Sequence, residues 1–97
     1  MLFTVNHSSM TSKSFDSLLK ILPAGSPILF FEDGVYNALA GSSSEVHVKE
    51  ALKTNPIFAL DADIEARGLK GIIEGIKKIG YDGFVELVEK HDMVPWI

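Results

Sequence analysis

Residues 28–41, ILFFEDGVYNALAG, decide the fold of this chain. The first four, ILFF, are apolar without alternation, which is typical of a strand covered on both faces, as in a parallel sheet. Two acids and a glycine end this run, and apolar residues then return at the spacing of a helix. The stretch therefore predicts a buried strand, a tight turn and a short helix that ends near Gly41.

Short apolar runs elsewhere in the chain predict the other strands. Residues 2–5 and 57–60 show the same unbroken pattern, and residues 77–81 suggest a fourth strand. The tail, residues 93–97, can add a short strand at the edge of the sheet. Because the runs lack a polar face, we expect each strand to be buried.

Apolar residues between the strands recur at the spacing of amphipathic helices. Residues 15–22 carry the clearest stripe, and the Pro-Ala-Gly sequence at 23–25 ends it. Further helices are expected around residues 48–52, between the acids at 61–63 and Gly68, and from Asp82 onward. The expected N-caps of these helices are Ser12 or Ser14, Asp33, Asp61 or Asp63, and Asp82.

This alternation of strands and helices predicts the fold class. It indicates an α/β protein with three layers, in which helices cover both faces of a mostly parallel sheet of four to five strands. A length of 97 residues fits one domain, residues 1–97.

Composition excludes several classes of function. The net charge of −4 argues against direct nucleic-acid binding, which depends on clustered Lys and Arg. The sequence has no cysteine, so it offers no disulfide, thiolate nucleophile or thiolate metal ligand. We also find no signal peptide and no apolar run approaching about 18 residues, so we expect a cytoplasmic protein without membrane contact.

Two acidic segments follow predicted strands, where ligands bind in open α/β sheets. After residue 31, the acid pair Glu32 and Asp33 could bind a cation or supply a base, or Asp33 could simply cap a helix while Gly34 allows the turn. In LDADIEARG, residues 60–68, Asp61 begins a spacing that resembles a calcium loop, but the required glycine and final glutamate are missing. Acids in a first turn, with Arg67 near the end, also suit the helix dipole.

Two aromatic residues complete the set of candidates. His7 follows the first strand, and Ser8, Ser9 and Asp16 lie near it in sequence, which allows a Ser-His-Asp arrangement on paper. Trp96, the only tryptophan, could pack on the core of its own domain or anchor in a neighbouring subunit. No pair of histidines has the spacing of a zinc site, and no metal or cofactor is expected.

Four segments in order resemble the DsrH/TusB family over nearly the whole chain. They are MLFTVNHSS at 1–9, FFEDGVYNALAG at 30–41, FALDADIEARGL at 58–69 and IGYDGFVELVEKHDMVPW at 79–96. The resemblance implies a compact α/β/α fold and a heterohexamer with two copies of each of three related chains. The other two chains would be a DsrE/TusD-like and a DsrF/TusC-like subunit.

Such complexes relay persulfide sulfur to carrier proteins, for the 2-thiolation of tRNA wobble uridine or for dissimilatory sulfur oxidation. The principal sulfur-carrying cysteine lies on the DsrE/TusD-like subunit, and some DsrH-type chains carry another in the first helix, where this chain has Leu18. The resemblance thus implies a non-catalytic subunit whose edge residues serve a subunit contact. The alternative is a stand-alone ligand-binding protein or hydrolase that uses the carboxyl edge of its sheet near His7, Asp33 and Asp61.

Overall fold

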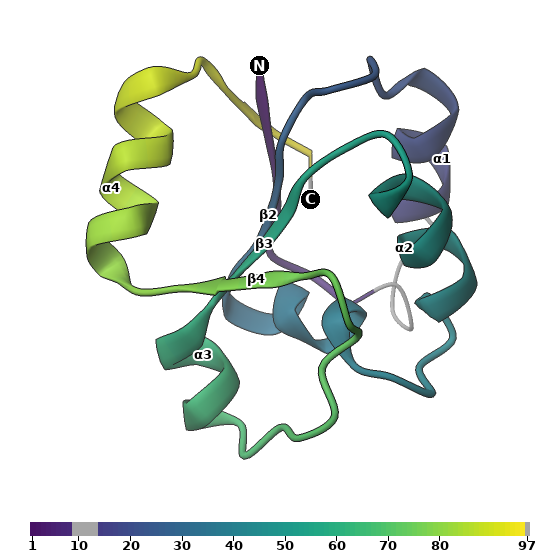
Figure 1. The fold of residues 1–97 in the computed structure, drawn as a ribbon, viewed down its shortest axis with the longest axis vertical. Coiled ribbons are helices and arrows are strands. Elements are labelled where there is room, and N and C mark those ends of the chain that lie inside the picture. Colours follow the sequence, from purple (N-terminus) through teal and green to yellow (C-terminus); the bar gives the residue numbers. More distant parts are fainter. Residues whose placement is uncertain (9–13, 97) are drawn as a thin grey trace.

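A five-stranded, all-parallel sheet forms the centre of the computed structural model, which describes residues 1–8 and 14–96 (Figure 1). The strand order is β4-β3-β2-β1-β5, so β4 and β5 are the edges. The strands are β1 (Leu2–Val5), β2 (Ile28–Phe30), β3 (Ile57–Leu60), β4 (Lys77–Ile79) and β5 (Met93–Pro95). The parallel α/β sheet predicted from the sequence is confirmed.

Helices cover both faces of this sheet, as predicted. Figure 1 shows α1 and α2 on one face and α4 alone on the other, with α3 near the end where the strands stop. The bounds are α1 (Ser14–Ile21), the 3-10 helix η1 (Glu32–Ala38), α2 (Glu45–Leu52), α3 (Asp61–Ala66) and α4 (Tyr81–Lys90).

Burial differs between the central strands and the edge strands. Every residue of β1 and β2 is buried, because side chains that alternate between the two faces find a helical layer on each side. Alternate residues Phe3, Val5, Ile28 and Phe30 join the core beneath α1 and α2. The expectation that all strands are buried is wrong for β4 and β5, since most of their residues are exposed at the two edges.

The predicted aspartate caps are also wrong. None of the helices η1, α3 and α4 has a side-chain hydrogen bond at its N-cap. The acids lie one to three residues after the N-cap, inside the first turn, where a negative charge still favours the positive end of the helix dipole. The N-cap residues are Phe31, Leu60 and Gly80. At α1, Ser14 is the first helical residue, and Ser12 lies outside the described residues.

Candidate functional site at the carboxyl edge of the sheet

The six residues singled out in the sequence come from four chain segments that follow strands. Because the strands are parallel, these segments gather at one end of the sheet, which we call the carboxyl edge. Trp96 follows β5, His7 follows β1, Asp33 and Gly34 follow β2, and Asp61 and Arg67 follow β3. The topology therefore brings the candidates to one edge, but only some of them touch.

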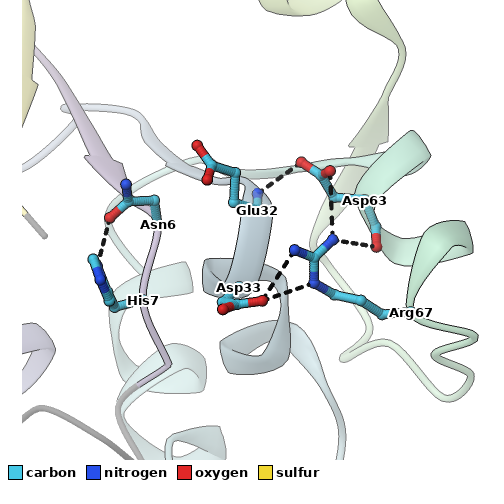
Figure 2. A network of polar contacts seen from close by, with 6 residues as sticks. All are labelled: Asn6, His7, Glu32, Asp33, Asp63 and Arg67. Atoms are coloured by element: carbon cyan, nitrogen blue, oxygen red, sulfur yellow. Dashed lines mark hydrogen bonds and ion pairs between the residues drawn. The ribbon is translucent and has the colours of Figure 1, made fainter.

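Arg67 is the centre of an ionic cluster at this edge (Figure 2). Its Nε and Nη2 atoms both lie 3.0 Å from Asp33 Oδ1, and its Nη1 lies 3.5 Å from Asp63 Oδ1. Nη1 also donates to the Asp63 carbonyl oxygen at 3.3 Å. The guanidinium side chain is 23% exposed, whereas that of Asp33 is 63% exposed. The cluster ties η1 to α3, and the pair with Asp33 is worth about 0–1 kcal/mol because solvent screens the exposed carboxylate of Asp33.

Asp63 also holds the backbone at the end of β2. Its Oδ2 accepts a 2.7 Å hydrogen bond from the Glu32 backbone N–H, as drawn in Figure 2. Glu32 has φ 49°, the left-handed region that non-glycine residues rarely adopt. The carboxylate of Asp63 therefore stabilises an unfavourable turn between β2 and η1. Asp63 was proposed only as a cap, so this long-range role was missed.

Gly34 is required for a reason other than the turn geometry predicted for it. The left-handed residue is Glu32, while a Cβ built on Gly34 would lie 1.9 Å from the Val5 carbonyl oxygen. That oxygen also accepts the Phe31 N–H at 3.1 Å. The glycine thus lets η1 press against the end of β1, where any side chain would displace backbone.

Asn37 completes this junction and was not anticipated. It is buried, and its Nδ2 donates to the carbonyl oxygens of His7, at 3.0 Å, and Gly34, at 3.1 Å. The backbone carbonyl of Asn37 accepts a bond from Ser44 Oγ at 3.2 Å. A 3-10 helix has about three residues per turn, which aligns residue 37 with residue 34. The helical spacing assumed from the sequence hides this alignment.

His7 lies exposed at the end of β1. Its Nδ1 is 2.7 Å from Asn6 Oδ1 (Figure 2). Asn37 Nδ2 donates to the carbonyl oxygen of His7 and so holds the backbone that carries the ring. In the suggested Ser-His-Asp arrangement, Ser9 and the side chain of Asp16 lie outside the described residues. The ring partner that the structure assigns to His7 is an amide oxygen rather than an acid or a hydroxyl.

Asp61 and Trp96 flank the cluster. Asp61 is half-buried and is the first residue of α3, where its charge favours the helix dipole. The Trp96 N–H donates to the Thr4 carbonyl at 2.9 Å and extends the pairing of β5 with β1. Its half-buried side chain packs against the core cluster, as one of its two predicted alternatives required. A role of the remaining surface as a subunit anchor stays a prediction.

Three cavities of the described molecule lie away from these six residues. Their volumes are about 470, 220 and 330 Å³, and they line α2, the α1–α2 contact and the gap between α4 and β4. Among residues 1–8 and 14–96, no group of three or more acids or histidines is arranged to hold a metal ion. No helix in these segments is long and apolar enough to cross a membrane.

Sequence comparison identifies relatives across almost all of the chain. A family model described as DsrH like protein matches residues 7–94. Protein TusB of Serratia proteamaculans is 45% identical over 94 residues, which cover 94% of each chain. Protein TusB of Salmonella dublin is 37% identical over the same share.

Solved structures share the fold at much lower identity. A protein of unknown function from Methanobacterium thermoautotrophicum has a TM-score of 0.77 at 15% identity, with 97% of this chain and 96% of that one covered. The YchN protein of E. coli has a TM-score of 0.75 at 14% identity, with 97% and 95% covered. These two matches establish the arrangement of the sheet and helices. The family model and the TusB relatives show that the chain belongs to the DsrH-like family.

Proposed function

We propose that this chain is a non-catalytic subunit of a cytoplasmic complex that relays persulfide sulfur for the 2-thiolation of tRNA wobble uridine. The observation that carries the proposal is the 45% identity to a TusB protein over 94% of both chains. Identity at this level along the full length favours the tRNA branch of the family over the branch that oxidises stored sulfur. The partners are a DsrE/TusD-like and a DsrF/TusC-like subunit in a heterohexamer, together with sulfur-carrier proteins.

The chemistry of the chain restricts its part in the relay. Sulfur transfer needs a thiolate that attacks a persulfide and then carries the sulfur, and this sequence has no cysteine. Leu18, at the position where some DsrH-type chains carry a thiol, is completely buried in the core. A thiol there would be inaccessible in this fold. The sulfur must therefore travel on a cysteine of another subunit.

The carboxyl edge supports a structural contribution to that transfer. Its exposed side chains rest on a backbone fixed by buried amide bonds and by the Arg67 cluster. Such a surface presents polar groups in a fixed arrangement, which favours docking because little conformational entropy is lost. We assign an interface role to His7, Asp33, Gly34, Asp61, Arg67 and Trp96.

Labelled sulfur tests this division of labour. The chain is co-expressed with its two neighbouring small α/β subunits, and the purified complex is incubated with a persulfide donor carrying radioactive sulfur. We expect the label, released by reductant, on the DsrE/TusD-like chain and none on this chain. Label bound covalently to this chain would overturn the non-catalytic assignment.

A second measurement tests the branch. Nucleoside analysis of tRNA from a deletion strain should show loss of 2-thiouridine, and the wild-type chain should restore it. Unchanged 2-thiouridine in the deletion strain would exclude the tRNA pathway, even if the chain still assembled with its partners.

The structure gives no support to the stand-alone hydrolase or ligand binder. The carboxylates of Asp33 and Asp63 are engaged with Arg67, and Asp63 also binds the Glu32 N–H. The three cavities described above are lined by other residues. Of the three residues that this alternative names, Asp33 is paired through Oδ1 with Arg67, and His7 Nδ1 lies 2.7 Å from Asn6 Oδ1.

A further inference from the structure

Helix α4 is unusual because none of its ten residues is buried, as judged within the part of the chain that the structure describes. The other described helices are all shorter than α4, and yet they bury side chains, such as Val48 on α2 and Ile64 on α3. Tyr81 and Val85 on α4 remain 64% and 50% exposed. An amphipathic helix normally buries its apolar side, so α4 has apolar surface to spare.

Only part of the apolar side of α4 meets the sheet. The ring of Phe84 lies 6.2 Å from that of Phe31, and Gly83 sits close to Ile79. Tyr81, Val85 and Val88 share an adjacent side of the helix, because they are spaced by four and three residues. Among the residues that the structure describes, Figure 1 shows α4 alone beside the strands on this face of the sheet, with α3 beyond the ends of the strands.

Strand β5 adds a fourth apolar residue to the same face. Met93 pairs with Leu2, whose side chain lies opposite Phe3 and therefore on the α4 side of the sheet. Met93 is 41% exposed. We call Tyr81, Val85, Val88 and Met93 the α4 face. It joins an apolar helix side to an edge strand, and both are features that subunit contacts commonly cover.

The charges beside the α4 face indicate what kind of protein covers it. Asp82, Glu89 and Asp92 are exposed around it, while Lys90 is bonded to Glu86 on the same helix at 2.6 Å. A two-fold contact with a second copy would bring this acidic rim against itself, and like charges across an interface are unfavourable. Charge complementarity instead requires a partner with Lys or Arg around an apolar patch.

We propose that the α4 face docks a different subunit of the sulfur-relay complex, one that presents an apolar patch rimmed by Lys and Arg. This inference rests on the proposed function and adds to it the surface through which the chain assembles. It predicts that substitutions on the α4 face abolish assembly without unfolding the chain, because its residues contribute little to the core.

A matched pair of variants tests the surface. Val85→Asp alters the α4 face, and Val46→Asp alters a more exposed valine on α2, on the opposite side of the sheet; the exposed fractions are 50% for Val85 and 74% for Val46. Each variant is co-expressed with the two neighbouring subunits and measured by native mass spectrometry, and its fold is checked by thermal unfolding. We expect Val85→Asp to weaken assembly at least about tenfold, as for a central interface residue, and Val46→Asp to assemble like wild type.

The outcomes separate the surface from the function. Intact assembly of Val85→Asp, or loss with Val46→Asp alone, would overturn the α4 face while leaving the subunit role standing. A homodimer that Val85→Asp dissociates would show that the occupant is a second copy, and would overturn the choice of partner. If the wild-type chain binds neither of the two neighbouring subunits, the proposed function is wrong and this inference is wrong with it.

Charge reversal tests the basic rim of the partner independently of packing. Asp82→Lys combined with Glu89→Lys should lower affinity about tenfold at low salt and less at high salt, because rim charges mainly govern electrostatic association. Glu74→Lys, on an exposed loop away from α4, is the matched control and should leave affinity unchanged. Unchanged or higher affinity for the double variant would overturn the assignment of a basic partner.

Discussion

The carboxyl edge and the α4 face are built in opposite ways. At the edge, Gly34, Asn37 and Arg67 join β1, η1 and α3 through a close backbone approach, buried amide bonds and ion pairs. On the α4 face, apolar side chains lie open and few contacts hold the helix. Polar and ionic contacts therefore hold the groups of the carboxyl edge in fixed positions, whereas the α4 face leaves apolar surface exposed for a partner.

Gly34→Ala should have the largest effect on stability, and it tests most strongly the contrast between the carboxyl edge and the α4 face. A methyl group there meets the Val5 carbonyl oxygen at 1.9 Å, so the backbone of β1 or η1 must move. We expect a loss of about 3 kcal/mol or more in the free energy of unfolding, measured by denaturant titration. Gly80→Ala is the control, because nothing lies within 4 Å of the added carbon and the backbone is extended. Equal effects of the two variants would contradict the close approach.

Asn37→Ala should rank second. The variant leaves the carbonyl oxygens of His7 and Gly34 without their amide donor, the first in a half-buried bond and the second in a buried one. An unsatisfied buried polar group costs about 1–3 kcal/mol, so the urea midpoint should fall accordingly. Hydrogen exchange should also quicken in residues 6–8 but not in α4. A stability loss spread evenly over both regions would weaken the distinction between them.

Arg67→Ala should cost less, about 1 kcal/mol, because solvent screens the exposed carboxylate of Asp33. The effect should shrink at high salt, whereas that of Asn37→Ala should not. Lys49→Ala removes an exposed ion pair with Glu45 on α2 and serves as control, with little or no change expected. A salt-independent loss at Arg67 would mean that packing of its side chain, rather than charge, holds the cluster.

Lys90→Ala should have the smallest effect. The hydrogen bond from Lys90, and then its charge, hold the pKa of Glu86 below the ordinary value. Because a lowered pKa in the folded state favours the ionised form, the pair persists as pH falls until it drops through that pKa. The substitution should raise the pKa of Glu86 toward its usual range in an NMR titration, with almost no change in melting temperature. An unchanged pKa would show that the pair does not form in solution.

The sequence was sufficient to predict the strands that are buried on both faces of the sheet. The unbroken apolar runs at 2–5, 28–31 and 57–60 predicted the three central strands, because strands between helical layers need no polar face. The same argument failed at β4 and β5, since the edge position of a strand follows from the strand order. Local sequence does not contain that order.

The sequence predicted where the candidate residues lie, at the carboxyl edge of the sheet, but not which of them contact each other. Asp33 and Arg67 were chosen because they follow strands, and both lie at the expected edge. Their pairing joins residues 34 positions apart, so spacing could not reveal it. The assumed capping by Asp33 failed because η1 begins at Glu32, which places Asp33 inside the first turn, and Asn37 was hidden by the 3-10 period of η1.

Native mass spectrometry of the wild-type chain, co-expressed with its two neighbouring small α/β subunits, tests the central claim most directly. We expect one complex that contains two copies of each of the three chains. A monomer, or an assembly of this chain alone in the presence of both neighbours, would contradict it.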